Sequence, residues 1–315
     1  MIGIDVGGAN LKIADDAGIH IHYCPLWENS PLTTLLLQYS RRDQDRAAVV
    51  MSGELADCFE TKLQGISYIV NAVREAFPRA LFYGTDAQFH DRAVPLLGAA
   101  NWLASADFLH ARHPNAVLLD VGSTTADIIP LNHFDNLVGM TDLDRLQAGY
   151  LLYTGMLRTG IATLLNSVEL AGIPTPVSTE HFATSADVHL VLGHIPPSLY
   201  TCDTPDRKEK TKKASLRRLA RVVCADLDEI GEGGAQEIAE QFWAIQRDMI
   251  CSNVKKIAKR SGTNEIIVAG VGAPLFSREL GGKDLNRELG SAADVLPAFA
   301  VREVAKARNI WIFCQ

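Results

Sequence analysis

The amino-acid sequence predicts an α/β protein built from two similar units. Short apolar segments of strand length alternate with segments of helical periodicity through most of the chain. Two stretches also look alike: MIGIDVGGANLKIAD at residues 1–15 and VLLDVGSTTADIIP at 117–130 both pass from an apolar strand through Asp and Gly into a second apolar strand. The chain has 315 residues, about twice the ~150 of a typical domain. We therefore expect two α/β domains, residues 1–115 and 116–315.

The first domain is expected to open with a meander of three strands, because the turn sequences GGAN and DDAG separate three apolar segments. Strands and helices then alternate, and the helix over 95–108 is rich in small residues suited to close packing on a sheet. The expected strands are 1–6, 10–14, 19–24, 47–51 and 80–83, and the expected helices are 31–40, 68–77 and 95–108.

The second domain is expected to repeat this opening and then to become mostly helical. The basic segment KKIAKRSG is typical of a helix C-terminus and ends the helix expected over 235–259. The run DRKEKTKKASLRRLAR at 206–221 predicts an exposed loop entering a basic helix, either a solvated face or a lid that closes on a ligand. The last helix, 295–307, is expected to pack back on the first domain. The other expected elements are strands 116–121, 125–131, 137–140 and 265–269 and a helix over 216–229.

Composition argues against several classes of function. A formal net charge of −7 argues against a nucleic-acid-binding protein, because phosphate backbones are held by an excess of Lys and Arg. No apolar run reaches the ~20 residues that cross a bilayer, and no signal segment precedes the first strand. The six cysteines are scattered without a CxxC pair, which favours reduced thiols. We expect a cytoplasmic protein with small-molecule ligands and no membrane partner; a homo-oligomer is left open.

Each Asp–Gly corner places a carboxylate and a tight turn at a strand end. Asp5 and Asp120 should therefore project beyond the edge of their sheets. Glycine allows backbone N–H groups to converge on an anion, and hydroxyls add donors. One such corner is also a common capped hairpin, but two that face each other would grip a diphosphate or triphosphate from both ends. The expected ligand-binding residues of the two corners are Gly7, Gly8, Asn10, Gly122, Ser123, Thr124 and Thr125.

Carboxylates do not favourably bind phosphate directly, so we expect a divalent cation between the two corners, with Mg²⁺ the best candidate. Asp5 and Asp120 would be its ligands. Asp127, further along the second hairpin, would complete the outer coordination shell of the metal.

Three motifs resemble those of a known superfamily. GIDVGGAN, LLDVGSTTADI and IIVAGVGAPLF are similar to the first phosphate, second phosphate and adenosine motifs of the actin, sugar kinase and heat-shock chaperone superfamily, and DVGSTTADIIP is most similar to its hydantoinase A/oxoprolinase branch. The resemblance implies a two-domain actin-like (ribonuclease H-like) fold with the ligand in the interdomain cleft. It also places Gly270 and Gly272 near the nucleobase of an ATP-using relative. Ala9 and Asn10 replace the Thr-containing end of the first loop, which argues against nucleotide hydrolysis.

Further stretches resemble a small family within this branch that is linked to tetrahydromethanopterin-dependent one-carbon metabolism and includes the methanofuran-biosynthesis enzyme. They are MSGELADCF, GAANWLASA, TDLDRLQAGYLLYTGMLRT, HFATSADVHLVLG, YTCDTPDRK and RLARVVCADLDEI. The resemblance implies a transferase that joins an aminomethylfuran methyl diphosphate to the phenol of γ-glutamyltyramine and releases pyrophosphate. Such a reaction needs Mg²⁺ but not ATP. An ATP-dependent kinase, a hydantoinase/oxoprolinase-like amide hydrolase and an actin-like scaffold are the alternatives.

Two cations and three carboxylates are further site candidates under this resemblance. Lys12 and Arg158 would complete the grip on the diphosphate. A solvated Lys12 fits the sequence slightly better than a ligand contact, and an Arg158 without a ligand contact fits equally well. Asp142, Asp144 and Glu54 are candidates for the base that receives the phenol proton. The competing explanations are a helix cap for Glu54 and a capping box with an intrahelical ion pair in TDLDRL.

Two common kinds of site are not supported by the sequence. His181, His189 and His194 lack the spacing of a compact zinc site, so core or surface histidines are expected. The chain contains no GxxxxGK[ST] loop, which excludes a Walker-type nucleotide site.

Overall fold

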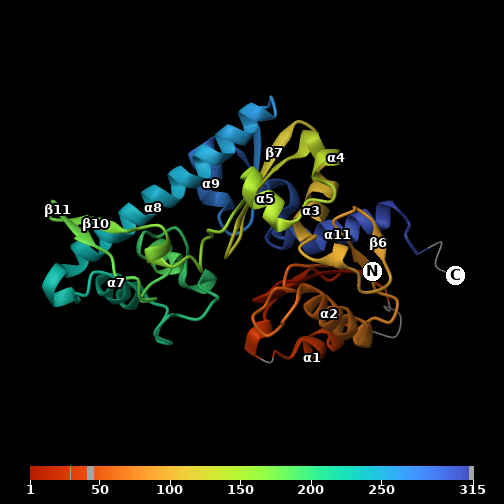
Figure 1. Ribbon diagram of the computed structural model, residues 1–315, viewed down its shortest axis with the longest axis horizontal. Helices are drawn as coiled ribbons and strands as arrows, with labels where there is room; N and C mark the ends of the chain where they lie inside the picture. Colours follow the sequence, from red (N-terminus) through yellow and green to blue (C-terminus); the bar gives the residue numbers. More distant parts are fainter. Residues whose placement is uncertain (29, 41–45, 312–315) are drawn as a thin grey trace.

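The computed structural model describes residues 1–28, 30–40 and 46–311 and shows two main sheets with helices around and between them (Figure 1). The first sheet has the strand order β3-β2-β1-β4-β5-β6. In it, β1 pairs antiparallel with β2 and parallel with β4, so the chain forms a meander and then crosses to the other side of β1. The strands are β1 (Ile2–Val6), β2 (Asn10–Ala14), β3 (Ile19–Tyr23), β4 (Ala47–Met51), β5 (Leu81–Tyr83) and β6 (Phe89–His90).

The second sheet repeats this plan. Its order is β13-β12-β7-β8-β9, with β7 antiparallel to β8 and parallel to β12. Counted from the opening strand of each unit, both sheets contain the order 3-2-1-4-5, to which the first sheet adds β6 at its edge. This shared order confirms the two-unit α/β fold that the repeated corner predicted. The strands are β7 (Ala116–Val121), β8 (Ala126–Pro130), β9 (Leu151–Leu152), β12 (Glu265–Ala269) and β13 (Lys283–Asp284).

Two helices lie between the sheets and give them a common core. Alternate residues of β4 face different layers, as the two-residue period of a strand requires. Val49 packs with α1 and α2 on the outer face, whereas Val50 belongs to a cluster that contains α3, α11 and residues of the second sheet. The last helix therefore lies against the first sheet. The two helices between the sheets are α3 (Asn101–His110) and α11 (Leu296–Ala307), and the two on the outer face of the first sheet are α1 (Leu32–Leu37) and α2 (Lys62–Ala76).

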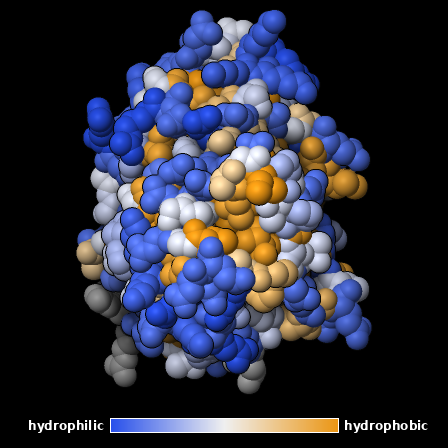
Figure 2. Space-filling view, turned by 90° about the vertical axis from the view of Figure 1, so that its left-hand side faces the viewer, coloured by the Kyte–Doolittle hydropathy of each residue, from blue (hydrophilic) through white to orange (hydrophobic). Residues whose placement is uncertain are grey.

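A separate apolar cluster of α6, α7, β10 and the N-terminal half of α8 extends the second lobe, and it was not predicted from sequence. The long helix α8 (Leu227–Arg260) packs its C-terminal half on β7 and β8, and its N-terminal half on a separate cluster with α6, α7 and β10. Figure 2 shows the molecule from the side that carries this cluster, where hydrophilic residues surround an apolar area. No helix of the described ranges is long and apolar enough to cross a membrane. The added elements are α6 (Ser185–Val191), α7 (Lys212–Arg221), β10 (Ser167–Leu170) and β11 (Ile173–Pro176).

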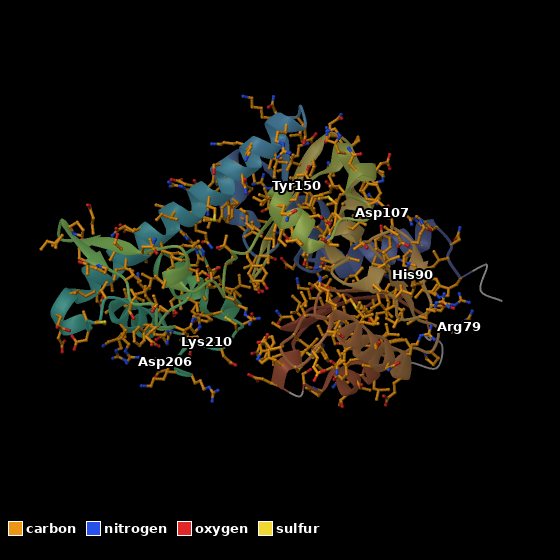
Figure 3. All side chains as sticks on the ribbon, viewed as in Figure 1. Arg79, His90, Asp107, Tyr150, Asp206 and Lys210 are labelled. Atoms are coloured by element: carbon orange, nitrogen blue, oxygen red, sulfur yellow. The ribbon has the colours of Figure 1, made fainter. Side chains whose placement is uncertain are left out.

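The basic run 206–221 is anchored by a buried arginine. Arg218, on α7, is fully buried and donates to Asp187 of α6 at 2.8 Å and to Asp206 at 3.0 Å. Ser215 and Tyr200 also donate to the Asp187 carboxylate, at 2.7 and 3.2 Å. Asp206 and Lys210 lie in the loop that precedes α7 (Figure 3). The loop before α7 is largely exposed, as its sequence predicted, whereas α7 itself buries Ala214, Ser215, Leu216, Arg218, Leu219 and Ala220.

Two predicted elements of the second domain were wrong. Residues 137–140 do not form a strand: they lie at the end of α4 (Phe134–Leu137) and in a turn where Gly139 has φ +87°, and the third strand of the sheet is β9. The helix expected over 216–229 is split between α7 and α8. Cys224 has φ +58° between them, a conformation that no helix continues, and Asp226 then caps α8 by accepting from the backbone of Glu229.

The predicted helices 68–77 and 95–108 have different boundaries in the structure. The first belongs to α2, which starts six residues earlier because the Thr61 hydroxyl accepts from the backbone N–H of Gln64. The second is interrupted after a short 3₁₀ turn at Pro95–Leu97, since Ala99 has φ +50°, and continues as α3. In both cases local backbone chemistry, not apolar periodicity, sets the start of the helix.

Candidate active site

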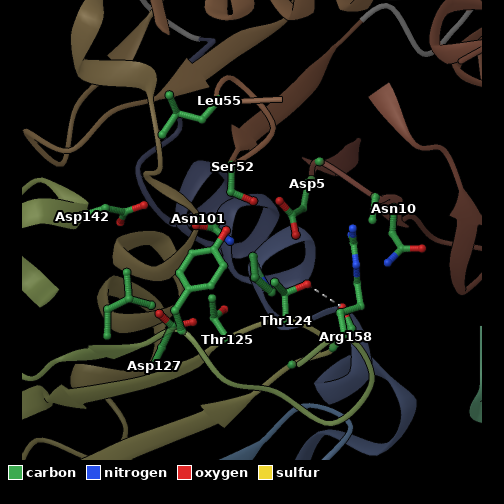
Figure 4. Close-up of a pocket in the computed structure, with 18 of the residues that line it drawn as sticks. Asp5, Asn10, Ser52, Leu55, Asn101, Thr124, Thr125, Asp127, Asp142 and Arg158 are labelled. Carbon is green, nitrogen blue, oxygen red and sulfur yellow. Dashed lines mark hydrogen bonds between the residues drawn. The ribbon is translucent and has the colours of Figure 1, made fainter. Parts of the chain in front are cut away.

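A cavity of about 620 Å³ lies between the lobes and contains most of the predicted site residues. Figure 4 shows Asp5 and Asn10 on one side of it and Thr124 and Arg158 on the other. The predicted residues that line it are Asp5, Gly7, Gly8, Asn10, Lys12, Asp120, Gly122, Ser123, Thr124, Thr125, Asp127, Asp142 and Arg158.

The two Asp–Gly corners occupy equivalent positions in the two sheets. Asp5 on β1 is directly opposite Lys12 on β2, and Asp120 on β7 is directly opposite Asp127 on β8. The repeat thus places one carboxylate and one cation at the first corner and two carboxylates at the second. We call these four residues, Asp5, Lys12, Asp120 and Asp127, the floor of the cavity. Lys12 is its one cation and comes from the first lobe.

Both turns keep backbone donors for a ligand. Gly7 donates to the carbonyl of Asn10, and Gly122 to that of Thr125, each at 2.9 Å, so the N–H of the first glycine is used within the turn. Within the described chain, the N–H groups of the residues that follow donate no hydrogen bond. They are the amides of Gly8, Ala9, Ser123 and Thr124. The amide donors that a ligand could use therefore begin one residue after the leading glycine of each corner.

The carboxylates of the floor are poorly solvated. Burial raises the pKa of Asp5 to about 6, against the opposing effect of Lys12, and raises the pKa of Asp120 to about 7, with further repulsion from Asp127. The pKa of Asp127 is also raised by burial, although Arg145 opposes the shift. Asp5 Oδ1 is buried and has no hydrogen-bond partner in the described chain. A cation bound here would relieve both the repulsion and the missing partner.

Arg145 is a site residue that the sequence predicted only as part of a helix. It lies on α5 (Asp142–Ala148), is 2% exposed, and forms ion pairs with Asp127 and, at 2.7 Å, with Asp142. Its guanidinium lies 4.3 Å from the ring centre of Trp102 on α3. The spacing of Asp142 and Arg145 indicated their intrahelical pair correctly, but nothing local indicated the contact with Asp127.

The three candidate bases have different surroundings. Asp144 lies outside the cavity lining and forms the capping box of α5 with Thr141, as the competing explanation proposed. Glu54 is 1% exposed and is not a cavity-lining residue; burial raises the pKa of its carboxyl group. It is not the cap of α2 either, since Thr61 has that position. Asp142 is the one of the three that lines the cavity.

The adenosine-like motif lies behind the end of β7 and does not line the cavity. Gly270 and Gly272 precede α9 (Ala273–Leu280) and are not lining residues. A Cβ atom on Gly270 would lie 2.4 Å from Asp120 Oδ1, and one on Gly272 would lie 2.8 Å from the Cβ of Val121. These glycines therefore allow β12 and α9 to approach the end of β7 closely, which supports the sheet-to-helix turn as their role.

A segment after β9 holds the second corner and presents Arg158. The amides of Leu157 and Arg158 both donate to the carbonyl of Ser123, at 2.9 and 3.0 Å. A Cβ on Gly155 would lie 2.6 Å from the Thr124 nitrogen, so only glycine allows this approach. The Arg158 guanidinium lies 4.7 Å from the ring centre of Trp27 in the first lobe. Arg158 thus reaches across the cavity from one lobe to the other.

A buried polar network supports this segment from α8. Gln246 donates to the hydroxyl of Thr154 at 2.9 Å and to the carbonyl of Gly155 at 3.0 Å, and its Oε1 lies 2.9 Å from His189 Nε2. His189 Nδ1 lies 3.0 Å from His194 Nδ1. His189 is therefore a core histidine, as expected. Within the described residues no group of three His, Cys, Asp or Glu side chains is arranged to hold a metal, and the five cysteines there are free, whereas Cys314 lies outside them.

The buried His189 predicts a loss of stability in acid. Burial lowers its pKa to about 3, so below the unfolded-state pKa of ~6.5 the unfolded chain takes up a proton that the folded protein does not. Stability is fully present above pH 6.5 and falls as the pH drops toward 3, by about 1.4 kcal/mol per pH unit. In urea unfolding, His189→Gln should therefore lose about 2 kcal/mol less than the wild type between pH 6.5 and 5. Parallel pH profiles of the two proteins would contradict this.

The fold and the cavity define this chain as a two-lobed actin-like α/β protein with a polar interlobe site. The profile of the hydantoinase/oxoprolinase family matches residues 45–301, and the chain belongs to this family. The (4-{4-[2-(gamma-L-glutamylamino)ethyl]phenoxymethyl}furan-2-yl)methanamine synthase of Methanocaldococcus jannaschii is 36% identical over 291 residues, 89% of this chain and 88% of that protein. The synthase of the same name from Methanococcus vannielii is 40% identical over 166 residues, 53% of this chain and 75% of that protein.

The nucleotide-free structure of acetone carboxylase, from work on ATP-dependent acetone carboxylation, is a structural relative. It gives a TM-score of 0.52 at 10% sequence identity and covers 95% of this chain and 69% of that one. At this identity the similarity shows the fold alone.

Proposed function

We propose that this protein is a synthase that forms the aryl ether of (4-{4-[2-(gamma-L-glutamylamino)ethyl]phenoxymethyl}furan-2-yl)methanamine, a step of methanofuran biosynthesis, from an aminomethylfuran methyl diphosphate and γ-glutamyltyramine. The relative of this name is 36% identical over 89% of the chain. The observation that carries the proposal is the pair of facing corners, which offer amide donors from both lobes to one polyphosphate.

The reaction is a displacement at the furan-bound methylene carbon. The phenol oxygen of the acceptor forms a bond to this carbon while the bond from the carbon to the diphosphate oxygen breaks. The electron pair leaves with pyrophosphate, and the phenol proton passes to a carboxylate. The amides of Gly8, Ala9, Ser123 and Thr124, with Lys12 and Arg158, would stabilise the charge that develops on the leaving group.

Asp142 is the best-placed proton acceptor among the three candidates. It lines the cavity, and Arg145 holds it in place through the ion pair at 2.7 Å. Arg145 also pairs with Asp127, so one guanidinium fixes the base and the second corner relative to each other. Asp144 and Glu54 do not line the cavity.

The floor of the cavity fits a magnesium ion. Asp5 and Asp120 present desolvated carboxylates, and Asp5 Oδ1 has no partner within the described chain. Mg²⁺ is usually held by one or two carboxylates together with substrate phosphates and water, and Asp5 and Asp120 supply two carboxylates to the cavity lining. Asp5 and Asp120 would hold the ion, with Asp127 behind them. When bound, it would neutralise charge on the departing pyrophosphate.

ATP is not part of the proposed reaction. The glycines of the adenosine-like motif pack against Asp120 and Val121 and leave the cavity lining to other residues. The kinase, hydrolase and scaffold alternatives all need a bound nucleotide. We also place the protein in the cytoplasm, on the basis of its scattered, unpaired cysteines.

The test is a pyrophosphate-release assay with the purified chain, the furanylmethyl diphosphate and γ-glutamyltyramine. We expect one pyrophosphate and one aryl ether per turnover, with activity lost in EDTA and restored by Mg²⁺. ATP should neither be consumed nor be required. Release of phosphate from ATP that depends on either substrate, without ether formation, would reject the proposal in favour of a kinase or hydrolase.

A further inference from the structure

The interlobe cavity has a charged inner end, and two large side chains with apolar surface stand at its outer rim. Asp5, at the inner end, is 4% exposed. Two apolar residues that also line the cavity are largely exposed, Tyr153 at 73% and Leu55 at 59%. They come from opposite lobes: Leu55 follows β4 of the first sheet, and Tyr153 directly follows β9 of the second. Large exposed apolar side chains at the opening of a polar cavity are typical of ligand contacts.

The Tyr153 side chain stands largely in solvent. Within the described part of the chain, no hydrogen bond or ring contact involves its side chain, so it contributes little to the stability of the fold. Trp27, the other aromatic residue of the lining, already has the Arg158 guanidinium 4.7 Å from its ring centre. The aromatic surface available to a ligand at the rim is therefore that of Tyr153.

We infer that Tyr153 and Leu55 form an aryl-binding subsite that seats the phenol ring of the acceptor. This inference rests on the proposed function. If the diphosphate is held at the inner corners, the furan ring, one methylene away, lies next to it. The acceptor oxygen must approach that methylene from the side opposite the leaving group, which is the rim. A flat ring stacked on Tyr153 and packed against Leu55 would have its oxygen directed inward.

The inference is tested by equilibrium binding of tyramine, a phenol-bearing amine, to the full chain with Mg²⁺ and pyrophosphate present, measured by calorimetry. Tyr153→Ala should weaken tyramine binding about 10-fold, since aromatic stacking adds to the burial of the ring. Tyr153→Phe, which keeps the ring, should bind within about two-fold of the wild type. Because Tyr153 is mostly exposed, the alanine variant should fold normally, which its thermal unfolding checks.

A saturated probe provides the matched control. 2-Cyclohexylethylamine should bind the wild type more weakly than tyramine and should respond less to Tyr153→Ala, because it cannot stack. Equal tyramine affinity in Tyr153→Ala and wild type would overturn the subsite, and so would the absence of tyramine binding to the wild type.

The subsite and the reaction can fail separately. Tyramine binding that depends on Tyr153, without pyrophosphate release from the furanylmethyl diphosphate, would reject the reaction and keep the subsite. Pyrophosphate release with an unchanged acceptor KM in Tyr153→Ala would keep the reaction and reject the subsite.

Discussion

Asp120→Asn should reduce ether formation by about 10³-fold while the protein stays folded. Asp120 ends β7 at the cavity floor, where the proposed reaction needs a negative charge to hold a cation against the leaving group. Asparagine has nearly the same shape but cannot supply that charge. Initial rates of pyrophosphate release at saturating and limiting Mg²⁺ would measure the loss, which excess Mg²⁺ should not restore.

The stability of this variant separates a catalytic role from a structural one. Burial raises the pKa of Asp120 to about 7 in the folded protein, above the ~3.8 of the unfolded chain, so wild-type stability falls as the pH rises between these values. Above pH 7 the wild type bears the full cost of the buried charge, and asparagine avoids it. Asp120→Asn should therefore be at least as stable as the wild type at pH 8.

Asp144→Asn is the matched control, because this exposed carboxylate forms the capping box of α5 outside the cavity lining. It should lower stability slightly, through the weakened capping box, and change activity less than about two-fold. An active Asp120→Asn variant, or an inactive Asp144→Asn variant, would reverse the assignment of these two carboxylates.

Arg218→Leu should lower the free energy of unfolding by about 3–5 kcal/mol. The change leaves Asp187 buried without its cation, and although Ser215 and Tyr200 still donate to it, they cannot neutralise it. It also frees the loop at Asp206, which Arg218 fixes at 3.0 Å. Urea unfolding followed by circular dichroism would measure the change.

Arg221→Leu provides the comparison on the same helix. Arg221 is 45% exposed and lies 3.6 Å from Asp206, so its loss should cost less than about 0.5 kcal/mol. Adding Asp187→Asn to Arg218→Leu should recover part of the stability, since the uncompensated charge is then removed. Equal effects of Arg218→Leu and Arg221→Leu would show that the buried pair does not hold the apolar cluster of α6, α7 and α8 together.

The repeated corner explains why so much of the site could be predicted. A strand that ends in Asp before a glycine turn fixes where the carboxylate projects, whatever packs around it. The same local pattern, present twice, indicated both the duplicated sheet and the two facing carboxylates. The match of DVGSTTADIIP and its neighbouring stretches to one family then supplied a chemistry that the residues alone did not specify.

Other residues could not be assigned from local pattern. Arg145 appears in the sequence as the partner of Asp142 on one helix turn, and its second contact, to Asp127, depends on how α5 packs against β8. Gln246 lies in a long helix without a distinguishing motif, yet it hydrogen-bonds Gly155, which is 91 residues away. Glu54 and Asp142 were equal candidates by sequence, and only burial and cavity lining separate them.

By itself, the sequence determined the two α/β units, the carboxylates at their strand ends and the glycine turns beside them, because each depends on backbone geometry within about ten residues. Tertiary structure alone decided that the lobes share a core through α3 and α11, that Arg158 reaches Trp27 across the cavity, and that Tyr153 is left exposed at its rim. These features depend on contacts between segments far apart in the chain, and no local preference encodes such a distance.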